Sequence, residues 1–228
     1  MHQKFTFASI CTLLISLMLS FATEARAQKV IIAEQEDSVP LFRGVAVSVD
    51  LFGAVQRQLS DYGQYEAALR VNLRDKYFPV LELGIGDANH EADIVTGIAV
   101  KTRAPYGRIG CDFNVLKNKH DVYRIYVGAR YAYTNFDFDL QHEGVKDPVY
   151  GGVAPYGIDK EKCYAHWLEG VFTVDAKIVG PMRLGWSVRY RRKIASELSS
   201  AGDVWYIPGF GRSDKTNIGG TFNITFEL

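Results

Sequence analysis

The chain has 228 residues, with 26 Lys and Arg against 26 Asp and Glu, so its formal net charge at pH 7 is zero. This balance argues against nucleic acid as a partner, because nucleic-acid-binding proteins concentrate positive charge. The length suits a single domain, and three cysteines are too few to form a disulfide framework.

The N-terminus has the features of a secretory signal peptide. His2 and Lys4 precede an apolar stretch from Phe5 to Phe21, and small residues flank Arg26. Cleavage after Ala27 is expected, which makes residues 1–27 the leader, residues 28–43 a periplasmic lead-in and residues 44–228 the folded domain. Without the leader the chain keeps 24 basic and 25 acidic residues. No later stretch is long and apolar enough for a membrane-spanning helix, so any membrane-spanning part must be a closed barrel.

Apolar and polar residues alternate with the period of a β-strand in eight segments after residue 44. In the seventh, for example, Met182, Leu184 and Trp186 alternate with Arg183, Gly185 and Ser187. The eight segments, in chain order, are 45–56, 66–73, 79–86, 108–115, 124–133, 168–178, 182–191 and 221–228. Eight amphipathic strands predict an all-β fold.

The polar face of these strands combines small residues with opposite charges. Such residues can fill the lumen of an eight-stranded barrel, which is just wide enough for side chains. The same alternation also fits a soluble barrel or sandwich with a solvated outer face, including a secreted barrel that carries an apolar ligand. The charges of this face include Asp50, Arg70, Glu82, Asp112, Arg124, Arg130, Glu169, Asp175, Arg183, Arg189 and Glu227.

The connection lengths favour the membrane barrel. Bacterial outer-membrane barrels have short periplasmic turns and longer extracellular loops. Short connections occur at 74–76, 117–121 and 180–181, while the opposite side has long ones at 87–105, 135–165 and 195–216. Only the first connection on that side, near Ser60, is short. The sequence therefore predicts an eight-stranded antiparallel transmembrane β-barrel with a plugged lumen, short periplasmic turns and mostly long extracellular loops.

Aromatic residues lie where the rims of such a barrel are expected. Tyr77 and Phe78 fall on the periplasmic side, and Tyr131, Tyr133, Tyr190 and Trp167 on the outer side. The chain ends in an amphipathic segment, Phe222 to Leu228, which we expect the barrel-insertion machinery to engage through its free edge. Cys111 is expected to face lipid, which argues against a bridge to Cys163.

These features together resemble the small eight-stranded outer-membrane barrels of the OmpX and OmpA-barrel type. More narrowly, the segments Val149 to Gly152 and Gly185 to Tyr190, with Trp167, resemble a family of Bacteroidetes outer-membrane proteins. The resemblance implies a location in the outer membrane and a barrel fold. It implies no particular chemistry, because one fold carries many functions.

A lipid A deacylase or acyltransferase is the alternative from another functional class. His90, His120, His142 and His166 are the available histidines, and His166 has Glu143, Glu169, Ser196 or Ser199 as conceivable partners. No spacing fixes a Ser-His-acid arrangement, since geometry defines such sites. We therefore expect no enzyme activity.

The remaining candidate site is a set of cations at the expected outer rim. Lys101, Arg103, Arg191, Arg192 and Lys193 could bind lipopolysaccharide phosphates by charge-assisted hydrogen bonds. Asp137, Asp139 and Asp147 lack the pattern of a calcium loop, and we expect no metal and no cofactor. The predicted function is surface recognition or adhesion through the loops, or a structural role in the membrane. The predicted partners are outer-membrane lipid, lipopolysaccharide and a possible extracellular surface ligand.

Overall fold

The computed structural model describes residues 40–90, 98–146, 149, 151–197 and 204–228. The predicted leader, 1–27, and most of the predicted lead-in lie outside the described residues. The folded part begins slightly earlier than predicted, because Phe42 and Arg43 already belong to the first strand.

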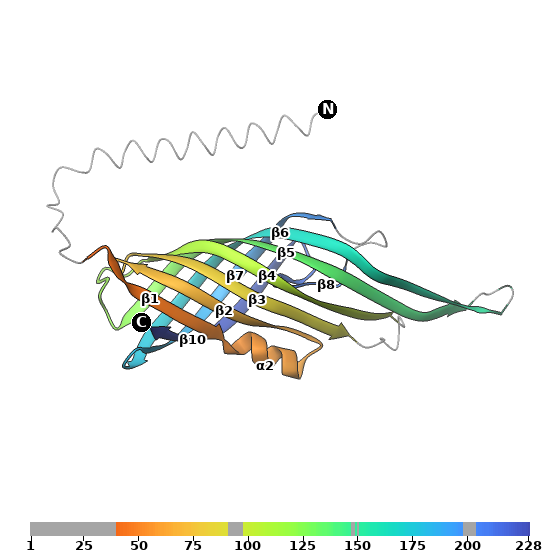
Figure 1. Cartoon of the computed structure of the whole chain (residues 1–228), viewed down its shortest axis with the longest axis horizontal. Coiled ribbons are helices and arrows are strands. Elements are labelled where there is room, and N and C mark those ends of the chain that lie inside the picture. Colours follow the sequence, from red (N-terminus) through yellow and green to blue (C-terminus); the bar gives the residue numbers. More distant parts are fainter. Residues whose placement is uncertain (1–39, 91–97, 147–148, 150, 198–203) are drawn as a thin grey trace, which may run out of the picture. The chain divides into compact units, whose positions relative to one another are not determined.

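Eight antiparallel strands form one closed ring in the order β1-β10-β7-β6-β5-β4-β3-β2 (Figure 1). This ring confirms the predicted eight-stranded barrel. Each strand pairs with its neighbour in sequence, and β1 closes the ring against β10. The strands are β1 (Phe42–Asp50), β2 (Tyr62–Leu73), β3 (Tyr77–His90), β4 (Ile98–Asn114), β5 (Tyr123–Lys146), β6 (Val153–Val179), β7 (Met182–Glu197) and β10 (Thr216–Glu227).

Short connections gather at one end of the barrel, here called the turn end, which also carries the start of β1 and the C-terminus. Arg74 and Asp75 both have positive φ, and the Lys76 amide donates to the Leu73 carbonyl at 3.1 Å. These are the features of a type I′ turn, whose twist matches that of the flanking strands. Gly180, also at positive φ, makes the equally tight turn from β6 to β7.

The opposite end, here called the hairpin end, differs from the prediction. Residues 87–105 and 135–165 were expected to be loops, yet most of them continue as paired strand. β3 reaches His90 and β4 starts at Ile98, while β5 and β6 stay paired out to Lys146 and Val153. The connections are long as predicted, but backbone pairing organises them into extended hairpins (Figure 1).

The predicted first strand is wrong beyond Asp50, where helix α2 (Leu51–Leu59) begins. The Asp50 carboxylate caps this helix by accepting hydrogen bonds from the amides of Phe52 at 3.0 Å and Gly53 at 3.1 Å. Capping of free first-turn amides is a strong helix-starting signal. The short connection near Ser60 is therefore a helix followed by a turn.

The connection predicted at 195–216 is long as expected, but its described part is more ordered than a simple loop. β7 continues to Glu197, and a small two-stranded sheet, β8 (Tyr206–Ile207) and β9 (Gly211–Arg212), follows. We call residues 204–212 the plug, because its apolar side chains pack on the inner faces of β4, β5 and β6. The resulting core comprises Val100, Ala104, Tyr106, Ala132, Phe136, Phe138, Cys163, Ala165, Trp167, Val204, Ile207 and Phe210.

The outer face of the barrel carries exposed apolar side chains over a limited height, here called the apolar belt. Ile109 is 62 % exposed and Trp186 is 63 % exposed, although both are large and apolar. The belt covers residues 77–85 of β3, 105–113 of β4, 123–133 of β5, 168–178 of β6 and 182–190 of β7. Beyond it, at the hairpin end, the outward positions become Asp87, Arg103, Asn135 and Arg192. No helix among the described residues is long and apolar enough to span a membrane.

Aromatic residues border the belt at both ends, as predicted for Tyr77, Tyr131, Tyr133 and Tyr190. Phe78 and Trp167 were also placed at these rims, and for them the prediction is wrong. Phe78 is 2 % exposed and Trp167 is fully buried, because both occupy inward positions of the alternation. Phe78 packs against Tyr126, and Trp167 packs against Phe210 of the plug.

The two cysteines of the folded part are free and lie on opposite faces of the wall. Cys163 is buried on the inner face of β6, and Cys111 occupies an outward position on β4. This arrangement confirms the expectation that they do not form a bridge.

Candidate functional site

The centre of the lumen is an ion-pair network built around Glu82 of β3. Its carboxylate contacts three arginines from three other strands. The distances are 2.7 Å to Arg189 Nη1, 3.2 Å to Arg130 Nε and 3.4 Å to Arg108 Nη1. All four side chains are almost completely buried, so each charge depends on the others for compensation.

Two further carboxylates extend this network toward the hairpin end. Glu66 of β2 pairs with Arg108 and, at 3.0 Å, with Arg189 Nη2. Glu169 of β6 lies 2.9 Å from Arg108 Nε and 3.4 Å from Arg191 Nε. Glu169 also accepts a 2.6 Å hydrogen bond from the indole nitrogen of Trp167. The carboxylates therefore tie β2, β3 and β6 to arginines of β4, β5 and β7.

Asp112 of β4 ends the network on the side of the turn end. It pairs with Arg130 Nη1 at 2.8 Å and with Arg70 Nη2 at 3.2 Å. The linked set thus contains five arginines, at positions 70, 108, 130, 189 and 191, and four carboxylates, at 66, 82, 112 and 169. These paired side chains fill the middle of the lumen, as predicted.

The plug closes the lumen toward the hairpin end, and the network holds it there. Arg108 Nη2 donates to the Gly209 carbonyl at 2.7 Å, and Arg191 Nη1 donates to the Phe210 carbonyl at 2.9 Å. Gly209 has φ +80°, and a Cβ at this position would lie 2.5 Å from the Tyr106 ring. A glycine is therefore needed where the plug turns over the arginines.

A second charged cluster closes the turn end around Asp75. Its carboxylate is 2.8 Å from Arg43 Nη1, 3.2 Å from Arg124 Nη2 and 2.6 Å from His120 Nδ1, and Asn72 donates to it at 2.6 Å. A cavity of about 100 Å³ lies beside this cluster, which leaves room for little more than a few water molecules.

The pKa of Asp75 lies below its usual value. Burial by itself raises the pKa, but hydrogen bonds from Asn72 and His120 and the charges of Arg124 and Arg43 outweigh it. A carboxylate with a lowered pKa stabilises the folded state above the pKa of the unfolded chain, and this contribution disappears as the pH falls through the folded pKa. We expect Asp75→Asn to lower the unfolding free energy at pH 7 by about 1 to 3 kcal/mol. The difference from wild type should shrink as the pH falls below about 4.

Urea unfolding in detergent at a series of pH values measures this difference. Asp214→Asn, which changes an exposed carboxylate near the hairpin end, serves as the control. A difference between wild type and Asp75→Asn that stays constant down to pH 2 would show that the carboxylate charge is not what stabilises the turn end.

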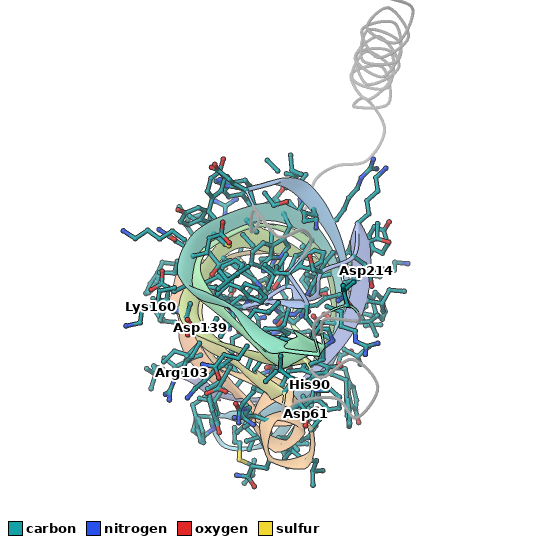
Figure 2. The ribbon with its side chains drawn as sticks, turned by 90° about the vertical axis from the view of Figure 1, so that its right-hand side faces the viewer. Asp61, His90, Arg103, Asp139, Lys160 and Asp214 are labelled. Carbon is teal, nitrogen blue, oxygen red and sulfur yellow. The ribbon has the colours of Figure 1, made fainter. Side chains whose placement is uncertain are left out.

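The structure separates the five cations predicted to bind lipopolysaccharide. Lys101 and Arg103 project outward from β4, and Arg103 Nε lies 3.7 Å from Asp87 (Figure 2). Arg192 projects outward from β7. The Lys193 ammonium lies 3.3 Å from the Ser213 hydroxyl, and Arg191 points into the lumen. Because β5 and β6 lie between β4 and β7, the outward cations form two sites and not one cluster.

Within the described part of the chain, the side chains that contact His166 are tyrosines, and neither Ser196 nor Glu169 is among them. His166 lies on the outer face of β6, where its Nδ1 is 2.6 Å from the Tyr131 hydroxyl and its ring packs against Tyr133 and Tyr164. Glu169, three residues on, points into the lumen. Ser199 and the side chain of Glu143 lie outside the described residues. Among the residues that are described, His166 belongs to the aromatic border of the belt.

The other histidines are held by neighbouring groups at either end of the barrel. His90 Nδ1 is 2.7 Å from Asp61, and the ring stacks on Trp205 (Figure 2). His142 Nδ1 accepts from the Gly144 amide at 2.9 Å. Asp139 accepts from the Lys160 amide at 2.8 Å. Within the described residues, no group of three His, Cys, Asp or Glu side chains is arranged to hold a metal.

Comparison with known proteins gives a family match over almost the whole sequence. A family model described as "Domain of unknown function (DUF6048)" matches residues 4–228. The chain belongs to the DUF6048 family. No curated protein matches the sequence.

Solved structures with similar folds are barrels of the bacterial surface. Neisserial surface protein A is 11 % identical, with a TM-score of 0.44 over 82 % of this chain and 99 % of its own. A major outer membrane protein from Thermus thermophilus is 10 % identical, with a TM-score of 0.42 over 81 % and 98 %. CarO2 from Acinetobacter baumannii is 14 % identical, with a TM-score of 0.41 over 82 % and 99 %.

Proposed function

We propose that this DUF6048 protein is an integral barrel of the outer membrane. The proposal rests on the apolar belt, whose nine to eleven residues per strand correspond to the ~9–11 residues with which a tilted strand crosses a bilayer. Aromatic borders at both ends of the belt support the same assignment. The tight turns then face the periplasm and the hairpin end faces outward, as in other bacterial barrels.

Within that location we propose surface recognition as the function. The side chains of the network and the plug occupy the lumen, which argues against a pore. The observation that carries the proposal is the pairing of β5 with β6 far beyond the belt, in a region we call the outer hairpin, residues 135–146 and 153–164. Twelve residues of strand reach about 40 Å, which displays a rigid two-stranded surface away from the membrane.

Shortening the outer hairpin tests this function without disturbing the barrel. Phe138 and Glu161 are directly opposite each other in the register, so residues 139–160 can be replaced by an Asn-Gly turn. We expect bacteria that display the shortened protein to lose adherence to epithelial cells and to matrix-coated surfaces, relative to bacteria with the intact protein.

The same bacteria provide the control for folding. The shortened protein should keep the heat-dependent shift in gel mobility of a closed barrel and the wild-type amount at the surface. Adherence that is unchanged in the shortened protein would contradict recognition by the outer hairpin and leave a structural role in the membrane.

A narrower proposal concerns lipopolysaccharide. Arg103 and Arg192 occupy the first outward positions beyond the belt on β4 and β7, and Lys101 follows on β4. Cations at this height would meet the phosphates of an outer-leaflet glycolipid. We expect the triple substitution of these residues by Gln to reduce the lipopolysaccharide that co-purifies with the protein at least threefold.

Lys177→Gln, which removes an exposed cation at the turn end, is the matched control and should leave co-purification unchanged. Equal amounts of lipopolysaccharide on the wild-type protein and the triple variant would exclude these residues as the binding site.

A further inference from the structure

The barrel wall is incomplete beside α2. β1 pairs with the C-terminal segment over six positions, from Val45 opposite Leu228 to Asp50 opposite Asn223 of β10. β10 nevertheless extends back to Thr216. β2 extends back to Tyr62, although Ala67 is the first of its residues that pairs with β1. Between these upper parts of β10 and β2 the described residues contain no strand. Helix α2 occupies the gap instead (Figure 1).

Helix α2 is fixed closely to β2. A Cβ on Gly63 of β2 would lie 2.4 Å from the Arg57 backbone nitrogen, and a Cβ on Gly53 would lie 2.7 Å from the Gln64 carbonyl. These two glycines let the helix and the strand approach backbone to backbone. On the other side, Asp50 bridges to β10 by accepting a 3.1 Å hydrogen bond from the Phe222 amide.

A cavity of about 480 Å³ lies between α2 and the upper part of β10, and we call it the window. This volume falls within the range of ~300–1,000 Å³ typical of small-molecule sites. Residues of both faces of the wall line the window. Val188 and Ile218 project outward, whereas Gln64 and Arg191 belong to the inner face.

The two ends of the window differ in polarity. Its outer part is apolar, with Phe52, Val188 and Ile218 exposed by 46, 57 and 73 %. Its inner part presents the polar side chains of Gln64, Arg191, Arg212 and Asn217. None of the described residues that line the window is a carboxylate. The arrangement suits a ligand with a long apolar chain and a negatively charged head.

Charge favours an anion at the inner end. Arg191 lies at the end of the central network that is nearest the hairpin end. This network contains five arginines and four carboxylates. Glu169, the ion-pair partner of Arg191, is shared with Arg108 and Arg189. Arg191 Nε has no hydrogen-bond partner among the described residues. A ligand carboxylate at this point would accept a charge-assisted hydrogen bond from this nitrogen.

The window lies at the level of the belt nearest the hairpin end. Gly220 is opposite Val188 and Ile218 is opposite Tyr190, the last belt residue before Arg192. If the barrel spans the outer membrane as proposed above, the window faces acyl chains of the leaflet on the hairpin side. A ligand can then enter sideways from the membrane without passing the plug.

We propose that the window binds one long-chain fatty acid, with its chain between α2 and β10 and its carboxylate at Arg191 and Arg212. A single chain suits the volume, and a carboxylate suits two guanidinium groups in a cavity whose described lining contains no carboxylate. The proposal rests on membrane insertion, but it is independent of recognition by the outer hairpin.

Binding can be measured with palmitate as the probe and hexadecanol as its uncharged counterpart. The protein is purified in an uncharged detergent, and native mass spectrometry counts the molecules retained per chain during a titration. We expect one palmitate per chain and at least about tenfold weaker binding of hexadecanol, since the loss of one charge-assisted contact corresponds to roughly that factor.

Two substitutions locate the site, each with a matched control. Gly220→Leu adds a side chain in the outer part of the window, where the nearest atom to its Cβ is the Ser187 carbonyl oxygen at 3.5 Å. Gly170→Leu makes the same change at an exposed position on β6 with no atom within 4 Å. Arg212→Gln removes an exposed cation of the window, and Lys177→Gln removes an exposed cation at the turn end.

We expect Gly220→Leu and Arg212→Gln each to weaken palmitate binding about tenfold or more. The two controls should bind as wild type, and all four variants should keep the gel mobility of a closed barrel. Wild-type protein that retains no palmitate would overturn the proposal. So would equal palmitate binding by Gly220→Leu and Gly170→Leu, or equal binding of hexadecanol and palmitate. None of these results would affect the proposed membrane location, which the substitution Ile109→Arg in the belt tests separately.

Discussion

Replacing Glu82 by Gln should destabilise the barrel more than any other single change of charge, by about 3 to 5 kcal/mol. The substitution keeps the size of the side chain but removes the carboxylate that faces Arg108, Arg130 and Arg189. All three arginines are buried, so they cannot exchange the lost partner for water. The lumen would then hold several positive charges without enough compensation.

Unfolding of the detergent-solubilised barrel by urea, followed by gel mobility, gives the measurement. Glu197→Gln makes the same chemical change at an exposed position of β7 and should shift the midpoint little. An unchanged midpoint for Glu82→Gln would show that the network does not stabilise the lumen as its geometry indicates.

The second large effect concerns the outer face. We expect Ile109→Arg to cost about 2 to 4 kcal/mol in a membrane, because Ile109 lies midway along the belt segment of β4. In water the same substitution at a 62 % exposed position would be nearly neutral. Its effect therefore separates a membrane barrel from a soluble one.

Outer membranes washed with urea can be assayed for the amount of inserted protein. Asn135→Arg, which places the same charge outside the belt on β5, is the control and should insert as wild type. Normal insertion of Ile109→Arg, or a purified wild-type protein that stays folded and monodisperse without detergent, would contradict the membrane assignment.

The strand alternation predicted which charged side chains of the strands point into the lumen. Arg183, Arg189 and Asp175 all point inward as expected, since neighbouring residues of a strand face opposite sides. The pairing partners could not be predicted in this way. Glu82 and Arg189 are 107 residues apart, and only closure of the ring brings them together.

Helix α2 was missed because its apolar residues satisfy two periods at once. Leu51 and Val55 are four residues apart, which fits alternate positions of a strand and one face of a helix equally well. The distinguishing signal is Asp50, a residue type that caps helices. The window depends on this helix, so the alternation could not reveal it either.

The plug was missed because a long connection between strands was expected to be a solvated loop. The sequence does carry a signal of burial, because Val204 to Ile207 together with Phe210 are too apolar for an exposed loop. The glycines at 209 and 211, both at positive φ, allow the sharp reversal that turns these residues inward. Arg191, which was predicted to belong to the cation site at the outer rim, lies on the inner face of β7.

The short pairing of β1 with β10 affects both the assembly and the unfolding of the barrel. Every other pair of neighbouring strands in the ring has a longer ladder of backbone hydrogen bonds. Separation of β1 from β10 therefore breaks fewer hydrogen bonds than separation of any other pair. Closure of the ring at this seam requires the pairing of only six facing positions, from Val45 to Asp50. Mechanical or thermal opening should begin at the same place and spread outward from it.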